Sequence, residues 1–282
     1  MDPHLSGRTA RSLETLHSLG YFAPEVEAEL VALGMRKGRA TYFASRSAAM
    51  GRVGPGTVTA TFFVFKPALV AKLIPAAWDA AEPQAVVAAR LRGIDAAYRR
   101  LLGDDAVAAP EIAEAAELTR TAVAACDPAG RPLYAGHADL DWPDEPHLAL
   151  WHGLTLLREY RGDGHIAALL SAGLTGIEGL VTHTATGTGF TVPAAQLTRG
   201  WSEDEWAATV AGLAERGLMT SDGALTQDGL DLRDRIESAT DEMAAAPWDL
   251  LGEAGTARLG EIGKPLVRAA IAAGAFPGGV FA

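Results

Sequence analysis

Apolar residues recur every three or four positions along most of this chain, which is the spacing of amphipathic helices. Proline and acidic residues stand where helices would begin and glycine stands where they would end, as the helix dipole and the left-handed cap favour. The pattern predicts helices over residues 8–19, 24–33, 40–50, 67–73, 83–102, 110–126, 145–160, 165–172, 202–216 and 230–245. We therefore expect a mainly α protein, built as a helical bundle.

Two stretches leave the pattern open. Residues 57–65 have the β-branched and aromatic content of a strand, but Val58, Thr61, Phe62 and Phe65 also fall on one helical face. We favour the helix. The run Gly162-Asp163-Gly164 is expected to break the helix that begins near Glu145, so that His165 opens a new one across a tight turn.

Residues 201–240 follow the order of a winged helix. Ser202 and Glu205 form a capping box before a helix. Residues 217–229 then resemble a short β-hairpin with its turn at Asp222-Gly223, and another helix follows. This layout looks like the end of a MarR-type regulator domain, which implies a DNA-reading helix and a basic wing.

The charges of this segment argue against DNA. Three consecutive carboxylates, Glu203 to Glu205, begin the expected reading helix, and the wing at 220–224 has no Lys or Arg. Because affinity for DNA depends on neutralising phosphates, such a surface would be repelled. We therefore expect a winged-helix element kept for packing or dimerisation, with DNA an unlikely partner.

Turn-rich segments at 127–132 and 141–146 mark a boundary, which predicts an N-terminal helical domain (1–140) and a second domain (141–282) containing the winged-helix element. The two halves share a faint order of helix, Arg, Gly turn and helix around Arg46 and Arg158. Chance similarity between two Ala-rich stretches explains this equally well. A true duplication would bring the two arginines together at a pseudo-twofold interface, where pockets form readily.

Composition narrows the class of protein. The 282 residues are 49% hydrophobic and 21% charged with a net charge of −11, which disfavours nucleic acid and anionic membrane as partners. A single cysteine excludes an intrachain disulfide and a Cys-rich zinc site. No signal peptide or membrane-length apolar run is visible, so a cytoplasmic location is expected. No nicotinamide, flavin or haem motif is present, and no cofactor or metal is predicted.

Residues 145–165 concentrate polar side chains in an apolar neighbourhood, where such groups must be paired or must serve chemistry. A histidine held by a carboxylate suits proton transfer near neutral pH, and two arginines suit an anionic substrate. The predicted site comprises catalytic His152, Glu159 and His165, with substrate bound by Arg46, Arg158, Asp163, Trp151 and His183.

Structural explanations compete with each of these roles. Arg158 and Asp163 could form a salt bridge that braces the turn, and Glu159 could simply pair with Arg46 or Arg158. His152 on a mostly apolar helix is more often a core histidine. A metal held by the two histidines and Glu159 has no established ligand spacing to support it.

Several motifs of the whole chain resemble a family of actinobacterial proteins of the SalK and EvbL type, identified as helix-turn-helix proteins and found in some antibiotic gene clusters. The motifs are residues 42–51, 60–67, 76–78, 156–165, 200–202, 225–226 and 240–241, and the resemblance spans roughly residues 8–280. It implies a shared fold and a place in specialised metabolism. It carries no established family chemistry.

Three functions follow as hypotheses. The first is a small-molecule enzyme or binding protein of specialised metabolism that acts on an anionic substrate by non-redox acid–base chemistry, namely elimination, cyclisation, isomerisation or substitution. The second is a winged-helix transcriptional regulator that senses a metabolite. The third is a structural partner subunit, and a homodimer or a heterodimer with a paralogue is expected.

Overall fold

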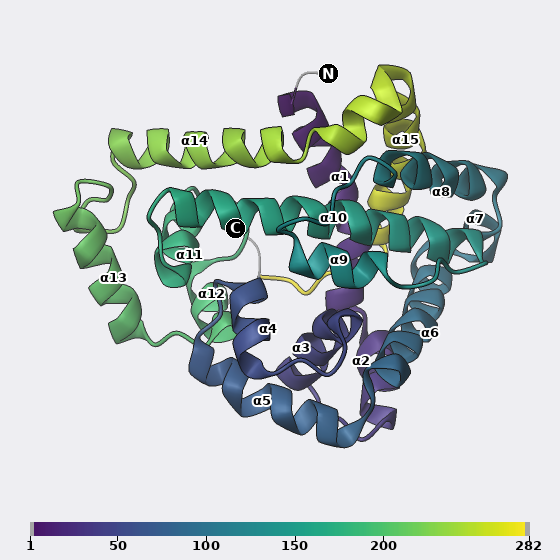
Figure 1. The fold of residues 1–282 in the computed structure, drawn as a ribbon, viewed down its shortest axis with the longest axis horizontal. Coiled ribbons are helices and arrows are strands. Elements are labelled where there is room, and N and C mark those ends of the chain that lie inside the picture. Colours follow the sequence, from purple (N-terminus) through teal and green to yellow (C-terminus); the bar gives the residue numbers. More distant parts are fainter. Residues whose placement is uncertain (1–2, 280–282) are drawn as a thin grey trace.

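The computed structural model describes residues 3–279, and all of the regular secondary structure there is helical (Figure 1). Residues 1–2 and 280–282, which include the last residues of the predicted C-terminal loop, lie outside the described residues. The helices are α1 (Pro3–Phe22), α2 (Pro24–Ala32), α3 (Arg39–Ser47), a 3-10 turn η1 (Ala48–Met50), α4 (Pro55–Phe62), α5 (Pro67–Ala80), α6 (Pro83–Leu102), α7 (Asp104–Val107), α8 (Pro110–Val123), α9 (Pro132–Ala138), α10 (Pro146–Ser171), α11 (Gly176–Thr184), α12 (Val192–Arg199), α13 (Glu203–Glu215), α14 (Gln227–Met243) and α15 (Ala246–Ala272).

The expectation of a mainly α protein is confirmed, and local sequence signals explain many of the helix ends. Proline occupies the first turn of α2, α5, α6 and α8, where its missing N–H and fixed φ cost nothing. The capping box of Ser202 and Glu205 forms at the start of α13. The ambiguous stretch at 57–65 is largely helical, as α4.

Helix α10 is the central element of the fold. It runs through the middle of the molecule and packs against α1, α6, α8, α9 and α14 (Figure 1). Three main apolar clusters surround it: one among α2 to α6, one among α1, α8, α10 and α15, and one that joins its C-terminal end to α11, α12, α13 and α14. Because α10 touches all three clusters, most of its side chains are buried, the polar ones included.

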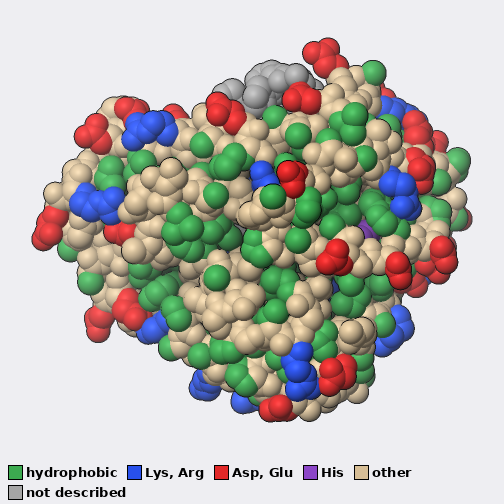
Figure 2. All heavy atoms as spheres, in the orientation of Figure 1, with side chains coloured by type: hydrophobic (Ala, Val, Ile, Leu, Met, Phe, Trp, Pro, Cys, Tyr) green, Lys and Arg blue, Asp and Glu red, His purple; other side chains and the backbone are tan. Residues whose placement is uncertain are grey.

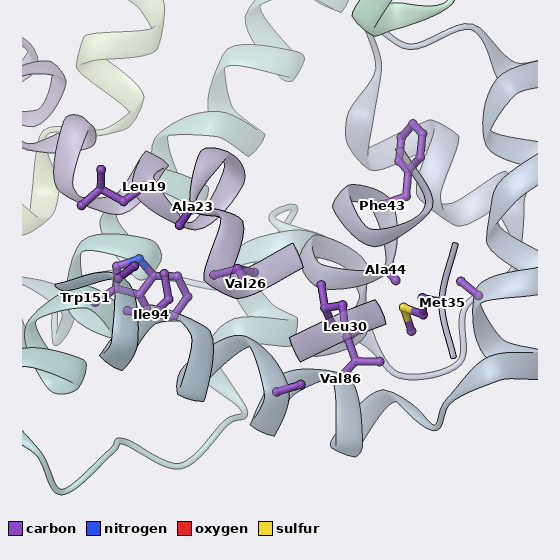
Figure 3. Packing of buried hydrophobic residues seen from close by; sticks show 14 of the residues in the cluster. Leu19, Ala23, Val26, Leu30, Met35, Phe43, Ala44, Val86, Ile94 and Trp151 are labelled. Carbon is purple, nitrogen blue, oxygen red and sulfur yellow. The ribbon is translucent and has the colours of Figure 1, made fainter. Parts of the chain in front are cut away.

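The contact between α2 and α6 is unusually close. Figure 3 shows Val26, Leu30, Val86 and Ile94 among the buried side chains of the cluster between these helices. At Gly93 the backbones approach so tightly that a Cβ would lie 2.5 Å from the Cα of Val26. A glycine is therefore required at this crossing, since the contact is with backbone and cannot be relieved by a side-chain rotation.

The predicted β-hairpin at residues 217–229 is wrong, and with it the winged element. Among the described residues there is no strand, and this segment forms one isolated bridge, Met219 with Leu225. Thr220 stabilises a local turn, because its backbone and its hydroxyl both donate and accept hydrogen bonds within residues 220–224. Helix α14 begins at Gln227, earlier than expected, so the last residues of the predicted hairpin, 227–229, are helical.

The predicted break at Gly162-Asp163-Gly164 is also wrong. Helix α10 continues without interruption from Pro146 to Ser171. The glycines serve close packing, since a Cβ at Gly164 would lie 2.9 Å from the Nη1 of Arg131 and 3.5 Å from the Cβ of Met243. Two glycines close together are typical of a turn, but they also occur where another segment packs tightly against a helix. The sequence alone does not distinguish these two cases.

The predicted division at residue 140 and the internal duplication stay predictions.

Within residues 3–279, no single helix is long and apolar enough to cross a membrane, while the bent pair α10 and α11 meets that test by length and composition only.

Replacing Gly93 by Ala is expected to lower the free energy of unfolding by about 1–3 kcal/mol, because the new methyl group forces α2 and α6 apart. Urea unfolding followed by circular dichroism measures this. The matched control is Gly212→Ala in α13, where a Cβ meets nothing within 4 Å. That variant should be unchanged or more stable by up to about 1 kcal/mol. Equal stability of the two variants would contradict the close approach.

Candidate functional site

A buried carboxylate gripped by two arginines lies at the centre of the molecule. Glu159 of α10 is 1% exposed, and both of its oxygens lie 3.0 Å from the Nη2 of Arg46 on α3. Arg158 donates from its Nη1 to the second oxygen at 2.6 Å, and its Nε reaches Glu14 of α1 at 3.3 Å. These contacts tie α1, α3 and α10 together through charge rather than through apolar packing.

This arrangement fixes the ionisation state of Glu159. Burial acts to raise the pKa of its carboxyl, but the charges of Arg158 and Arg46 outweigh burial and hold that pKa well below its ordinary value. A carboxylate that is ionised and already accepts three charge-assisted bonds is a poor proton acceptor. Glu159 is therefore suited to hold its neighbours in place, and the geometry does not favour the predicted role of general base.

A hydrogen-bond chain leads from this cluster to α1. The hydroxyl of Thr155 donates to the carbonyl of Trp151 at 2.9 Å, so it accepts from the Nδ1 of His17 at 3.0 Å. The Nε2 of His17 is then free to accept from the hydroxyl of Tyr21, at 2.6 Å. Burial lowers the pKa of His17 well below its ordinary value, which agrees with a neutral ring that donates on one side and accepts on the other.

A cavity of about 820 Å³ opens in front of these groups. It lies between α1, α2, α3, the end of α12 and the C-terminal segment after α15, and aromatic rings make up much of its wall. The residues that line its wall include Tyr21, Phe22, Tyr42, Ser45, Phe65, Arg158, Phe190, Arg199 and Phe276. The volume is in the range of pockets that hold a small organic molecule.

Two polar side chains of the cavity wall are left without full partners in the described part of the chain. The hydroxyl of Ser45 is buried, with the residue 2% exposed, and has no hydrogen bond. Arg199 packs its guanidinium 4.5 Å from the ring centre of Phe65 and 4.7 Å from that of Phe190, and its Nε is buried without a partner. Its Nη1 donates to Thr198 at 3.0 Å, and no described carboxylate lies within salt-bridge distance.

Burial lowers the pKa of Arg199, because a guanidinium held among rings loses hydration without gaining an opposite charge. Arg199 closes α12, and its backbone carbonyl accepts from the N–H of Lys66 at 3.0 Å. The cation therefore sits on a fixed turn, and among the described residues no carboxylate pairs with it.

The structure brings together only part of the predicted site. Arg46 and Arg158 each contact the carboxylate of Glu159, while the duplication hypothesis stays a prediction. Of all the predicted residues, Arg158 alone lines the large cavity. Arg46 and Glu159 lie behind its wall.

The two predicted catalytic histidines lie elsewhere. They are thirteen residues apart on one continuous helix, which separates them by about 20 Å along its axis. His152 is buried edge-on against Trp142, with ring centres 5.0 Å apart. His165 bonds to the hydroxyl of Thr240 on α14 at 2.9 Å and lines a smaller cavity of about 110 Å³. Neither is placed to exchange a proton with Glu159.

The remaining predicted residues have structural partners. Trp151 is buried, donates to the carbonyl of His17 at 3.2 Å and lies 4.6 Å beneath the guanidinium of Arg90. Asp163 does not pair with Arg158. It accepts from the backbone N–H groups that begin α9, at 3.0 and 2.9 Å, and burial raises its pKa to about 6. His183 lies at the end of α11, beside Gly189.

Sequence reasoning missed His17, Tyr21, Tyr42, Ser45 and Arg199. A signal existed for the first three: His17 and Tyr21, like Tyr42 and Arg46, are four residues apart in predicted helices and so share a face. No sequence signal connects Arg199 with Phe65, because that contact is made only when α12 docks beside α4. In residues 3–279, no group of three or more His, Cys, Asp or Glu side chains is arranged to hold a metal ion.

Replacing Glu159 by Gln is expected to lower the free energy of unfolding by about 3–5 kcal/mol, because the buried guanidinium of Arg46 and the partly buried one of Arg158 would lose their shared carboxylate. The control is Glu14→Gln, which removes a partly exposed partner of Arg158 and should cost no more than about 1 kcal/mol. Urea unfolding at neutral pH measures both. Similar losses in the two variants would mean that the buried pair does not brace the fold.

The buried histidines predict an acid-sensitive stability. Burial lowers the pKa of His152 and His165 to about 4 and that of His137 to about 3. Below the unfolded pKa of about 6.5 the unfolded chain therefore binds protons that the folded chain excludes, and stability falls as pH drops from about 6.5 toward 4. Asp163 opposes this trend between about pH 6 and 4, because its folded carboxyl protonates first.

The variant His152→Leu isolates one of these protons. Its stability relative to the native protein should rise as the pH is lowered from about 7.5 to 5, since a leucine side chain has no proton to exclude. Urea unfolding at several pH values gives the difference, and the comparison at about pH 7.5 serves as the control. A difference independent of pH would show that His152 titrates normally.

The model of a helix-turn-helix family matches residues 6–277 of the chain. No curated protein and no solved structure matched. The match covers nearly the whole length, including the helices that build the cavity, whereas the finer resemblances to SalK, EvbL and MarR proteins stay predictions. The chain belongs to this helix-turn-helix family.

Proposed function

We propose that the protein binds a small anionic molecule with a largely apolar, aromatic-compatible body in the cavity of about 820 Å³. The observation that carries this proposal is Arg199, a cation packed between two phenylalanine rings of the cavity with no carboxylate of the described residues within salt-bridge distance. Charged side chains in such surroundings are normally paired. A bound anion would supply the missing partner.

The charges around the cavity support an anion over a cation or a neutral guest. Three guanidiniums, those of Arg46, Arg158 and Arg199, face two carboxylates, those of Glu159 and Glu14. Arg39 also lines the cavity with no described carboxylate within salt-bridge distance, so the described positive charges outnumber the negative ones. The surrounding rings would exclude water from a guest placed there, which strengthens its attraction to Arg199.

The geometry of the wall indicates the shape of the guest. Aromatic side chains of Phe22, Phe65, Phe190 and Phe276 offer faces and edges on which a flat apolar body can pack. The unpartnered hydroxyl of Ser45 offers one directional hydrogen bond. We therefore expect an amphipathic organic acid rather than a compact inorganic anion.

This proposal keeps the anionic partner expected from the sequence but changes the residues that hold it. Arg199 replaces Arg46, which is already committed to Glu159. Turnover of the guest by His152, Glu159 and His165 is not supported, because the two histidines lie outside the cavity and Glu159 is saturated.

A fluorescent probe of matched charge tests the proposal. The native protein should bind 1-anilinonaphthalene-8-sulfonate more tightly than N-phenyl-1-naphthylamine, which has the same rings without the sulfonate. The variant Arg199→Gln should weaken binding of the sulfonate by about 10- to 100-fold, the loss of one charge-assisted bond, and should leave the neutral probe unchanged. Fluorescence titration gives both affinities.

The control variant is Arg216→Gln, which removes an exposed arginine at the end of α13 that pairs with Glu178 of α11. It should bind both probes as the native protein does. Circular dichroism must show each variant folded, since the sulfonate probe also binds loosened cores. Equal affinity of the native protein and Arg199→Gln for the sulfonate would refute the proposal.

Family membership favours a second candidate, a DNA-binding regulator whose affinity changes with the guest. Helices α11, α12 and α13 share one apolar cluster, as a helix-turn-helix unit requires. The charges are unfavourable: Glu203 and Asp204 begin α13, and on the face in Figure 2 basic side chains are interspersed with acidic ones.

A mobility-shift titration with the DNA upstream of the protein's own gene, repeated across salt concentrations, decides between the candidates. We expect only weak binding that disappears at physiological salt. Nanomolar, sequence-specific binding that responds to the sulfonate probe would establish the regulator instead.

A further inference from the structure

Tyr42 differs from the other tyrosine of the cavity wall in what happens to its proton. Its hydroxyl accepts from the Nη1 of Arg46 at 3.0 Å, and among the described residues it has no acceptor of its own. Tyr21, by contrast, has two acceptors for its proton, the Nε2 of His17 at 2.6 Å and the Oε1 of Glu159 at 3.4 Å. Tyr42 is thus the phenol of the wall whose O–H is left for the cavity.

The groups around Tyr42 come from six elements and are mostly cationic, and α6 contributes the buried guanidinium of Arg90. Helix α3 contributes Arg46 and, farther out, Arg39, while the end of α12 contributes Arg199. Helix α10 contributes Arg158 and Glu159, and α1 contributes Glu14 with the neutral pair His17 and Tyr21. On α2, Glu27 lines the cavity but is paired with Lys37 at 3.2 Å. The balance near the phenol is therefore positive.

We infer that Tyr42 is the proton-exchanging residue of the cavity: at alkaline pH its phenolate supplies negative charge when the cavity is empty, and it takes up a proton when an anionic guest supplies that charge. This inference rests on the proposed function for the guest, and on the contacts of Tyr42 for the proton.

The transfer is balanced in simple steps. In the empty cavity the O–H bond of Tyr42 breaks, the proton leaves to water, and the electron pair stays on the phenolate oxygen, which Arg46 stabilises. When an anion lies against Arg199, a proton from water or from an acidic group of the guest returns to that oxygen. A guest that arrives as a neutral acid would lose its proton directly to Tyr42.

The direction of the pKa of Tyr42 agrees with this geometry. Burial acts to raise it, but the charges of Arg46, Arg199 and Arg158 outweigh burial and lower the pKa below its ordinary value. The other buried phenols behave in the opposite way. Burial raises the pKa of Tyr21, Tyr98 and Tyr134, which are not faced by the same excess of cations.

Ultraviolet titration of the unliganded protein tests the inference without any guest. The chain has five tyrosines, so one equivalent of tyrosinate absorption should appear below about pH 10 in the native protein and should be absent from Tyr42→Phe. The variant Tyr134→Phe should keep it. Native protein and Tyr42→Phe that titrate alike would overturn the inference.

The variant Arg199→Gln keeps the test decisive if Tyr42→Phe does not fold. It should move the same transition to higher pH, because one of the cations that favour the phenolate is gone. An unchanged midpoint would mean that Arg199 and Tyr42 do not share a charge balance.

Adding 1-anilinonaphthalene-8-sulfonate connects the proton to the guest. In weakly buffered solution above the midpoint, binding to the native protein should take up protons, and the affinity should fall by up to about tenfold per pH unit. In Tyr42→Phe, neither effect should appear. If the sulfonate does not bind at all, the proposed function fails while the ultraviolet titration still reports on Tyr42. If it binds without proton uptake, only the present inference fails.

Discussion

The buried pairing of Glu159 with Arg46 and Arg158 is the interaction on which this structure depends. It joins residues 113 positions apart in the chain, and each partner is buried enough that its charge would be costly if left alone. Apolar contacts can slide or repack, whereas a shared carboxylate requires a definite distance and direction. The pairing therefore sets the register between α3 and α10, and with it the position of Tyr42 on the one helix and of Arg158 on the other.

The end of α12, with Thr198 and Arg199, forms one side of the cavity in front of this pairing. The indole of Trp201 donates to the carbonyl of Val64 at 2.9 Å, and Lys66 lies 2.6 Å from Glu205. These contacts hold the end of α12 and the start of α13 against the loop between α4 and α5, and so they position Arg199 at the cavity. The first turn of α13 carries three acidic residues, of which Glu205 pairs with Lys66.

Local sequence signals were sufficient for the helices but not for the site. Proline at helix starts and the Ser202 capping box predicted boundaries well, because these effects act within one turn of the chain. Glycine misled at residues 162 and 164, where it allows a neighbour to approach rather than the chain to turn. Glu159 and His152, which suggested catalysis, have structural partners, whereas Arg199 could not be predicted because its contacts with Phe65 and Phe190 depend on how distant segments pack.

Gly200, directly after Arg199, holds a left-handed backbone with φ of 82°, and a Cβ there would lie 2.9 Å from the Cδ2 of Leu69. The course of this turn is thus settled by backbone and by neighbouring packing, independently of what projects from it. Divergence among relatives can then act on the rings and polar tips facing the chamber, such as Phe190 and Thr198, while the scaffold is inherited intact. A few substitutions at such positions can therefore change the shape and charge of the cavity while the turn keeps its course.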